Sequence, residues 1–499
     1  MSFAQVFTRS VVGLHAPEVT VEVHLSQGLP ALTIVGLPEA SVRESKDRVR
    51  SAILNSGFEF PNRRLTINLA PADLPKDGAR LDLPIAIGIL AASGQIDERV
   101  LADFEFIGEL ALNGELRDVS GALAVARAMK VDGERSLIAP KASATEAAKV
   151  SGVAALGADS LGAVCRHLEV LAGINQNPED RLTPAVAASD VKPVYRLDLA
   201  DVKGQYHARR ALEVAAAGGH SLLFKGVPGS GKTLMASRLP SILPPLNDDE
   251  ALEVASTYSV ADMMHEYGVR PFREVHHTIS AVALVGGGSR PKPGEITLAD
   301  KGVLFLDELP EFDRRVLEVL RQPIEAKEII ISRANSQVRF PANFQLIAAM
   351  NPCPCGYHGD TSGRCHCTAL AVQRYQEKLS GPLLDRIDLH VSVPALPIDD
   401  LQNAAQGESS DVVRERVVAA RNRATLRQGK SNNELSPSEL DKHARLGESE
   451  QALLKCATAR LNLSARSYHR IVRVARTVAD LASSEYIATA HLAEALSYR

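Results

Sequence analysis

The sequence lacks long hydrophobic runs and an apolar leader. No run of eighteen apolar residues occurs among its 499 residues, which is the length that a membrane-spanning helix needs. Residues 1–6 have neither the basic start nor the apolar centre of a signal segment. These absences exclude a membrane-spanning helix, and we expect a cytoplasmic protein with no membrane partner.

The sequence also lacks an excess of positive charge and is poor in aromatic residues. Its 56 Lys and Arg residues are outnumbered by 60 Asp and Glu residues, which gives a net charge of −4. It has no tryptophan, and aromatic residues make up 4% of the chain. A polyanionic partner must therefore be bound by local basic patches, and stacking on aromatic side chains is not expected to dominate.

Cysteine is scarce as well, and its distribution argues against a disulfide framework. Of the six cysteines, four lie within fifteen residues of one another. These four are Cys353, Cys355, Cys365 and Cys367. Four thiolates suit a tetrahedral zinc ion, with His358 and His366 as alternative ligands, although the CxC spacing differs from the CxxC pairs of common zinc ribbons. We expect a structural zinc site, because four protein ligands leave no open position.

The order of sequence patterns predicts a mixed α/β protein of three domains. Residues 176–194 are polar and interrupted by prolines, which is typical of a linker. The other segments are an α/β domain at 1–175, a nucleotide-binding core at 195–395 and a helical region at 396–499. In the first domain, the alternation of residues 19–25 predicts a strand, 41–54 a helix and 65–69 another strand.

A glycine-rich segment fits the pattern GxxxxGK[ST]. It lies between an apolar strand predicted at 222–224 and a helix predicted to begin at 234. It consists of Gly226, Val227, Pro228, Gly229, Ser230, Gly231, Lys232 and Thr233. In such a loop the glycines let backbone N–H groups turn onto phosphates, the lysine reaches the β- and γ-phosphates, and the Thr hydroxyl ligates magnesium. The strand context disfavours an ordinary glycine-rich turn. We therefore expect this chain to bind ATP and magnesium.

Two further strands end in polar residues suited to hydrolysis. The strand 303–306 is followed by Asp307, which is placed to hold magnesium, and Glu308, which is placed to polarise the attacking water. The strand 344–350 is followed by Asn351, which can sense the γ-phosphate; a simple turn before a proline is the alternative for this residue.

The order of these motifs resembles the AAA+ ATPases, and longer strings are more specific. The strings are HHTISAVALVGGGSRPKPGEITLADKGVLFLDELPEF, NPCPCGYHG and RYQEKLSGPLLDRIDLHV. They resemble the magnesium-chelatase-like ComM/YifB family over essentially the whole chain. The resemblance implies an AAA+ P-loop core with a pore insertion at 256–299, a zinc-knuckle insertion at 353–367 and a helical lid.

The same resemblance implies roles for residues outside the phosphate loop. Gln205, in DVKGQ, corresponds to the adenine-side segment, and Arg386, in LLDRID, to an arginine finger that enters a neighbouring subunit. Arg466, in LSARSYHR, corresponds to the lid arginine called sensor 2. Arg374 is a second candidate for the finger, and an ordinary ion-paired arginine is the alternative for each. The family forms rings, so we expect a homo-hexamer.

The N-terminal domain resembles the Lon-type protease fold, a ribosomal S5 domain 2-like α/β fold, without its catalytic pair. The PKDG at 75–78 mirrors the segment before the catalytic serine, and the serine position is then Arg80. The lysine position is Leu123. A Ser–Lys pair needs a hydroxyl and an amine, so we expect a scaffold without protease activity; a rearranged pair of Ser120 and Lys76 is the alternative.

Two loops carry basic residues that could contact a phosphate backbone. One is the insertion 256–299, which contains Arg270, Arg273 and a Gly-Gly-Gly tip, and the other is a predicted hairpin at 329–340. The four cations that we expect to contact DNA are Arg290, Lys292, Arg333 and Arg339. Basic loop residues are often merely solvated, and it is their convergence in a ring that favours DNA.

The family resemblance implies an ATP-driven DNA motor, a helicase or branch-migration enzyme of natural transformation or recombination, that acts on single-stranded or branched DNA. Two alternatives share the same motifs. One is a metal-chelatase-like motor subunit that acts on a protein partner. The other is an ATP-dependent protease, which Arg80 and Leu123 disfavour.

Overall fold

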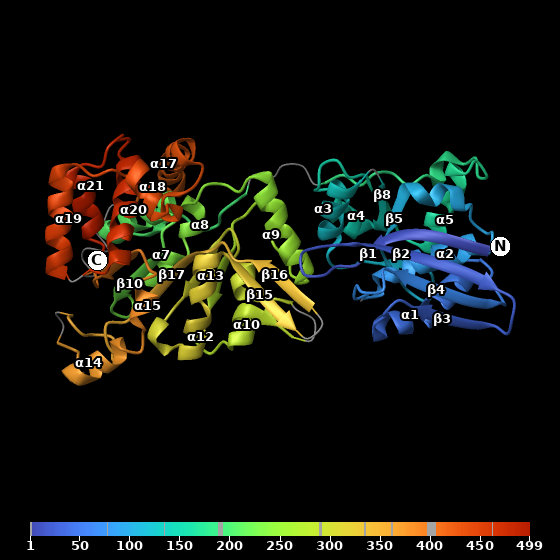
Figure 1. The fold of residues 1–499 in the computed structure, drawn as a ribbon, viewed down its shortest axis with the longest axis horizontal. Helices are drawn as coiled ribbons and strands as arrows, with labels where there is room; N and C mark the ends of the chain where they lie inside the picture. The colour runs from blue at the N-terminus through green and yellow to red at the C-terminus, as the bar shows by residue number, and fades with distance from the viewer. Residues whose placement is uncertain are drawn as a thin grey trace. The chain divides into compact units, whose positions relative to one another are not determined.

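The structure, a computed structural model, describes residues 2–76, 78–133, 135–187, 193–288, 292–333, 336–360, 363–396, 406–461 and 463–499. The chain forms two compact units (Figure 1). The first consists of Met1–Lys192 and Leu252–Tyr267, and the second of Pro193–Ala251 and Gly268–Arg499. Among the described residues, no helix combines the length and the apolar character that crossing a membrane requires.

The first unit is built on a mixed seven-stranded sheet with the order β3-β4-β2-β1-β5-β8-β9. The strands are β1 Ser2–Arg9, β2 Glu18–Ser26, β3 Ala31–Val35, β4 Arg64–Ala70, β5 Phe104–Phe106, β8 Ser136–Pro140 and β9 Ala155–Ala158. β6 (Glu109–Leu110) and β7 (Leu116–Arg117) form a small separate ribbon. In β2 the buried side chains are those that alternate with polar ones, which confirms the predicted strand.

Helices cover this sheet and complete two apolar clusters. They are α1 Ala40–Asn55, α2 Asp82–Ala92, α3 Ala122–Asp132, α4 Lys141–Ala147 and α5 Leu161–Leu171. α2 is buried along its whole length, because one face meets β1 and β2 and another meets α1. α1 and β4 confirm the helix and the second strand that the sequence predicts.

The helix α9 (Asp248–Val260) crosses the boundary in sequence between the two units. Leu252 belongs to the apolar cluster that contains α3 and α4. The backbone N–H of Gly121 donates to Ser259 Oγ at 2.9 Å, and Lys149 lies over the Tyr267 ring. Residues 252–267 are therefore part of the first unit, although the family resemblance predicts one pore insertion of the core over residues 256–299. That insertion stays a prediction.

The second unit contains a five-stranded parallel sheet in the order β11-β14-β17-β10-β18. The strands are β11 Phe272–Val275, β14 Val303–Leu306, β17 Gln345–Met350, β10 Leu222–Gly226 and β18 Leu389–Val393. The predicted strands 222–224, 303–306 and 344–350 are thus confirmed. β17 lies between β10 and β14, so the carboxyl ends of these three strands meet at one edge.

Short helices and two ribbons connect the strands of this sheet. The helices are α6 Tyr206–Gly218, α7 Lys232–Ala236, α8 Leu239–Ile242, α10 Ala281–Val285, α11 Glu295–Leu298, α12 Arg314–Val319, α13 Arg321–Ala326, α14 Ala369–Gln376 and α15 Gly381–Leu384. The ribbons are β12 (Gly286–Gly287) with β13 (Lys292–Pro293), and β15 (Glu328–Arg333) with β16 (Ser336–Pro341). The second ribbon is the predicted hairpin, and it packs on α13 (Figure 1).

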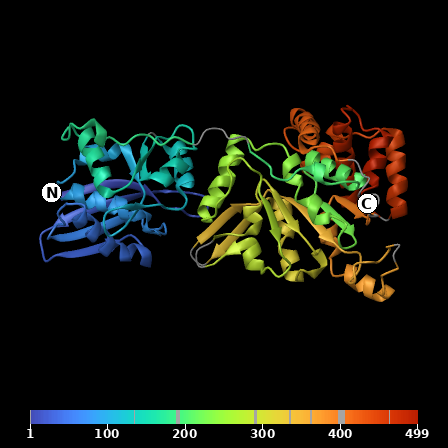
Figure 2. The ribbon, with the colours of Figure 1, turned by 180° about the vertical axis from the view of Figure 1, so that it is seen from behind.

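The C-terminal helices share one apolar core with the parallel sheet. They are α17 Ser410–Gln428, α18 Pro437–His443, α19 Glu448–Leu461, α20 Ala465–Leu481 and α21 Thr489–Leu496. Val417 of α17 and Val474 of α20 lie in the same cluster as Phe224 of β10. Seen from behind in Figure 2, these red helices lie beside the green α6 and α8.

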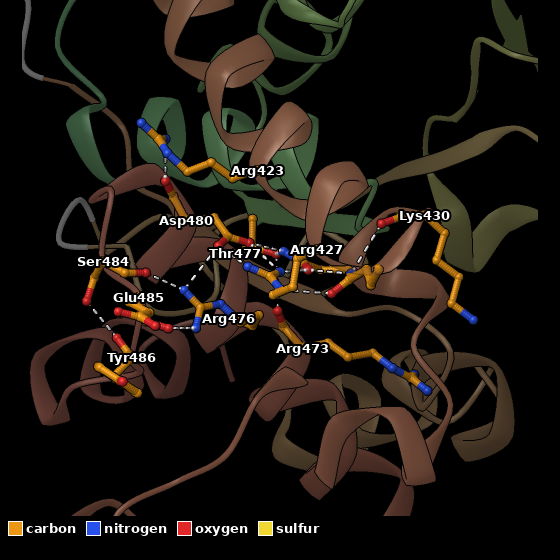
Figure 3. A network of polar contacts seen from close by, with 12 residues as sticks. Arg423, Arg427, Lys430, Arg473, Arg476, Thr477, Asp480, Ser484, Glu485 and Tyr486 are labelled. Atoms are coloured by element: carbon orange, nitrogen blue, oxygen red, sulfur yellow. Dashed lines mark hydrogen bonds and ion pairs between the residues drawn. The ribbon is translucent and has the colours of Figure 1, made fainter. Parts of the chain in front are cut away.

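A buried carboxylate ties α17 to α20 within this helical region. Asp480 accepts hydrogen bonds from Arg427 at 2.7 and 2.9 Å and from Asn432 at 2.8 Å (Figure 3). Arg476 Nη2 lies 3.0 Å from the same carboxylate. The network therefore joins α17, the following turn and α20 through paired rather than orphan charges.

Candidate nucleotide-binding site

The phosphate loop begins at the last residue of β10 and leads into α7. A Cβ on Gly226 would lie 2.2 Å from the carbonyl oxygen of Val393, so only glycine fits there. Gly229 and Gly231 have φ values of 77° and 87°, which side chains other than glycine disfavour. The loop that follows can therefore turn its backbone N–H groups toward an anion.

Lys232 is buried inside this loop, with 8% of its surface exposed. Its Nζ donates to the carbonyl oxygens of Gly226 and Val227 at 2.8 and 3.0 Å, and to Asn351 Oδ1 at 3.2 Å. Burial lowers the pKa of Lys232, while Asp307 and Glu308 oppose this change. The ammonium group of Lys232 thus contacts residues at the carboxyl ends of both β10 and β17. This is the position of the lysine that reaches the phosphates in a phosphate-binding loop.

Thr233 and Asp307 meet at the same edge of the sheet. Thr233 Oγ1 donates to Asp307 Oδ2 at 2.7 Å, and the other carboxylate oxygen of Asp307 accepts the backbone N–H of Glu308 at 2.8 Å. A hydroxyl and a carboxylate are oxygen ligands of the kind that Mg²⁺ takes. These two side chains therefore fit a magnesium ion shared with the nucleotide phosphates.

Glu308 leaves β14 in a left-handed backbone conformation, with φ of 53°. Its carboxylate is half exposed and lies 3.2 Å from His277 Nδ1. His277 follows β11 and packs against the ring of His276, with centroids 4.2 Å apart. No local sequence signal places His277 beside Glu308, because the parallel pairing that brings the ends of β11 and β14 together is a property of the fold.

Arg386 and Arg466 lie together, at the edge of the sheet opposite to Lys232. Arg386 precedes β18, and Ser221 Oγ, just before β10, donates to its carbonyl oxygen at 3.0 Å. Arg386 Nε and Arg466 Nη2 lie 3.0 and 3.1 Å from the same oxygen of Glu325. At about 3.3 Å per residue, a strand the length of β10 separates the two edges by about 13 Å. The sheet therefore separates this arginine pair from the phosphate loop of its own chain.

Gln205 lies close to the end of β18 rather than in the loop itself. It has a φ of 47°, and its side-chain amide donates to the carbonyl oxygen of Pro394 at 2.7 Å. Asp201, in the same segment, pairs with Arg238 at 3.0 Å. The segment before α6 is thus fixed against the carboxyl edge of the sheet, and its adenine-side role stays a prediction.

The four clustered cysteines form a group that can hold a metal ion. Their sulfur atoms all lie within 4.8 Å of one another, and Cys353 Sγ lies 3.3 Å from Cys355 Sγ and 3.8 Å from Cys365 Sγ. Tetrahedral zinc with Zn–S bonds of about 2.3 Å needs sulfur atoms about 3.8 Å apart, so the donor set fits zinc. Among the described residues, neither His358 nor His366 belongs to this group.

The cysteine loop contacts the phosphate loop directly. A Cβ on Gly356 would lie 2.6 Å from Pro228 Cγ and 3.9 Å from Asn351 Cγ. The backbone N–H of Gly356 donates to the carbonyl oxygen of Cys353 at 2.9 Å. The cysteine loop therefore packs against the phosphate loop that holds Lys232, so a shift of one loop would displace the other.

Of the four residues predicted to contact DNA, only Lys292 and Arg339 have side chains that the structure describes. Arg290 lies outside the described residues, and so does the side chain of Arg333. Lys292 is exposed on β13. Arg339 is exposed on β16, with Nη1 3.7 Å from Glu328 across the hairpin, a surface pair that holds it only weakly.

Two other cations of the insertion, Arg270 and Arg273, are held by contacts within the second unit. Arg270 is partly buried and donates to the carbonyl oxygen of Pro244 at 2.6 Å, and Arg273 forms a two-bond ion pair with Glu295 at 2.7 and 2.9 Å. Internal acceptors therefore hold both side chains, and neither belongs to the four cations that we expect to contact DNA. A Cβ on Gly286 would lie 2.4 Å from the carbonyl oxygen of Lys292, so this glycine serves close backbone packing.

In the first unit, the segments that would hold a Ser–Lys pair do meet. Arg80 Nη2 donates to the carbonyl oxygen of Ser120 at 2.9 Å. Leu123 is fully buried. Lys76 is also buried and donates to the carbonyl oxygen of Pro71. A guanidinium therefore reaches the place where the two segments approach each other, and it supplies no nucleophile.

A parallel sheet with a phosphate loop, an acidic strand end and a polar strand end defines a P-loop nucleotide-binding protein of the AAA+ class. Family models match three parts of the chain: "Subunit ChlI of Mg-chelatase" at residues 21–143, "Magnesium chelatase, subunit ChlI" at 198–401 and "Magnesium chelatase, subunit ChlI C-terminal" at 407–499. Among individual relatives, Competence protein ComM of Haemophilus influenzae is 50% identical over all of this chain and 98% of its own length.

YifB of Escherichia coli is 48% identical over all of this chain and 97% of its own length. The Magnesium-chelatase 38 kDa subunit of Rhodobacter capsulatus is more distant, at 24% identity over 34% of this chain and 54% of its own length. The chain belongs to the magnesium-chelatase-like ComM/YifB family. Its fold is an AAA+ P-loop core followed by helices and preceded by a Lon-protease-like α/β domain.

Proposed function

We propose that this chain is a subunit of a ring-shaped ATPase that uses hydrolysis to move DNA, as a helicase or branch-migration motor. The observation that carries the ATPase proposal is the separation within one chain. Lys232, Thr233 and Asp307 lie at one edge of the sheet. Arg386 and Arg466 form ion pairs with Glu325 at the other edge. A complete hydrolytic site then needs two subunits.

The geometry of each edge supports a division of roles. Lys232 and the loop N–H groups bind the phosphates, Thr233 and Asp307 hold magnesium, and Glu308 accepts a proton from the attacking water. Asn351, bonded to Lys232 at 3.2 Å, orients the γ-phosphate. Magnesium neutralises charge on the phosphates when it is bound. Arg386 and Arg466 of the adjacent subunit stabilise the charge that develops on the transferring group, and a homo-hexamer places one such pair at each interface.

DNA is the proposed substrate because a full-length relative carries the name Competence protein ComM. In this chain, the exposed side chains of Lys292 and Arg339 lie on two ribbons of the core unit and support contacts with a phosphate backbone. A chelatase-like motor is the second candidate, yet the Magnesium-chelatase 38 kDa subunit of Rhodobacter capsulatus is 24% identical over only 34% of this chain. A protease role would need a nucleophile where Arg80 lies.

The test of this proposal is the ATP turnover of the wild-type protein and of Glu308→Gln, each with and without forked DNA. We expect forked DNA to stimulate the wild type, and Glu308→Gln to lower turnover by about 10²–10⁴, the usual contribution of general-base catalysis, while nucleotide binding is retained. Glu311→Gln, three residues further along, is the matched control and should turn over normally. An ATPase that DNA neither stimulates nor engages would contradict the DNA proposal but not the ATPase proposal.

We also propose that the cysteine cluster holds one structural zinc ion. The support is the mutual approach of four sulfur atoms within 4.8 Å, since reduced cysteines without a metal have no reason to converge so closely. Metal analysis of the purified chain should give one zinc per chain, and Cys365→Ser together with Cys367→Ser should abolish it. Zinc retained by that double variant, or absent from the wild type, would overturn the proposal.

A further inference from the structure

A cationic cavity lies at the amino edge of the parallel sheet, within the second unit. Its inner part has a volume of about 250 Å³, and it adjoins an outer part of about 600 Å³ that contains Arg386 and Arg466. Lys327 and Glu434 line both parts. Because liquid water occupies about 30 Å³ per molecule, the inner part alone has room for a small ion with several waters.

The inner part has more positive than negative groups. The charged residues that line it are Arg270, Lys301, Lys327, Arg421, Glu250 and Glu434. Four cations against two carboxylates leave an excess of two positive charges. Concentrating like charges in an enclosed space costs free energy, and a bound anion would lower that cost.

The two arginines are held by backbone oxygens, which fix their position without neutralising their charge. Arg421 donates to the carbonyl oxygens of Ala216 and Ala217 at 2.7 and 2.8 Å. Arg270 donates to the carbonyl oxygen of Pro244 at 2.6 Å, and its nearest carboxylate, that of Glu250, is 3.7 Å away. Both guanidinium groups are therefore held in place, and the ion pair of Arg270 with Glu250 uses one of the two carboxylates already counted.

The surrounding cations disturb one another, as the directions of their pKa shifts indicate. Burial lowers the pKa of Arg421 to about 10, and the charge of Arg270 adds to that effect. Burial also lowers the pKa of Lys327, and Lys301 and Arg421 contribute further. Lys327 also pairs with Glu434, which is one of the two carboxylates already counted, so this pair leaves the excess of positive charge in the cavity unchanged.

The adjoining outer part adds an unsatisfied donor. Arg470 is buried, and among the described residues its Nη1 has no hydrogen-bond partner; its Nε lies 3.5 Å from Asp388. Asp388 itself accepts from the backbone N–H and the hydroxyl of Ser221 at 3.1 and 3.2 Å, so it is already engaged. An oxyanion in the cavity would satisfy the free N–H of Arg470.

We propose that this cavity binds inorganic phosphate, with Arg421, Lys301 and Lys327 as its principal ligands. The tetrahedral dianion offers four acceptor oxygens, which suits converging guanidinium and ammonium groups. The assignment does not depend on the proposed DNA motor, because it concerns a site that each chain forms by itself. In a ring, the cavity would stand beside the arginine pair that faces a neighbour's nucleotide.

The experiment measures phosphate binding by calorimetry in a Lys232→Ala background, which removes the ammonium of the nucleotide loop. We expect saturable binding that Lys301→Gln weakens by about tenfold to a hundredfold, the loss typical of one charge-assisted bond. Arg421→Gln should weaken it similarly, and circular dichroism checks that each variant is folded. Lys442→Gln, a lysine on α18 outside the cavity, is the matched control and should bind phosphate normally.

Two results would overturn the assignment. One is the absence of saturable phosphate binding in Lys232→Ala protein. The other is an unchanged affinity in both Lys301→Gln and Arg421→Gln, since phosphate would then bind elsewhere. Neither outcome depends on ATP turnover or DNA, so failure here is distinguishable from failure of the motor proposal.

Discussion

The contact between Glu308 and His277 is the point at which a single residue can adjust the hydrolytic site. The two side chains are 3.2 Å apart, with 50% and 31% of their surfaces exposed. An exposed pair of this kind is worth roughly 0.2–1 kcal/mol. His277 therefore restrains Glu308 without locking it.

His277→Gln should raise ATP turnover without DNA by no more than about fivefold, because the freed carboxylate has lost only a weak competing contact. The affinity for nucleotide should not change. Steady-state turnover and nucleotide titration measure the two quantities. His276→Gln is the control, and an equal effect of that variant, or no effect of His277→Gln, would refute the assignment.

Two glycines of the cysteine loop offer a matched test of its contact with the phosphate loop. Gly356 and Gly359 have similar φ values, 88° and 81°, so alanine strains the backbone equally at both. Only at Gly356 does the added methyl meet Pro228, at 2.6 Å; at Gly359 it meets nothing within 4 Å. Gly356→Ala should thus weaken nucleotide binding by about 5- to 150-fold, from an overpacking cost of roughly 1–3 kcal/mol, whereas Gly359→Ala should not. Equal affinities for the two variants would count against a mechanical link.

At the scale of helices and strands, the sequence predicts most elements because each has a strong local signal. Alternation identifies β2, and apolar runs that end in polar residues identify β10, β14 and β17. Local sequence signals do not determine the order of strands in a sheet. The position of β17 between β10 and β14 is therefore known only from the structure. For the same reason, the pairing of β11 with β14, which brings His277 to Glu308, could not be predicted.

The carboxylate of Asp480 is the main polar link between α17 and α20 (Figure 3). Asp480→Ala leaves the buried Arg476 and the partly buried Arg427 without their counter-charge, so it should lower the free energy of unfolding by about 3–5 kcal/mol. Urea denaturation monitored by circular dichroism measures this change. Asp441→Ala, on the exposed surface of α18, should change it by less than about 0.5 kcal/mol. A similar loss in both variants would mean that the network does not stabilise the helical region.

At the scale of the whole molecule, the sequence predicts the phosphate loop and two acidic residues of the site, and in the structure Lys232 contacts Asn351 and Thr233 contacts Asp307. The sequence does not indicate that Arg386 and Arg466 share the carboxylate of Glu325, since these three residues come from distant segments. The sequence also does not indicate that residues 252–267 belong to the first unit. Their apolar pattern does not determine the surface against which these residues pack.

The central claim is that adjacent subunits complete each hydrolytic site, and mixing two inactive variants tests it most directly. Lys232→Ala lacks the phosphate-binding lysine, and Arg386→Ala lacks the arginine given to a neighbour, so each alone should lose about 10³-fold or more in ATP turnover. In a one-to-one mixture, about a quarter of the head-to-tail interfaces unite an intact loop with an intact arginine, and turnover should rise to about a quarter of the wild-type rate. A mixture no more active than its two components would contradict the account.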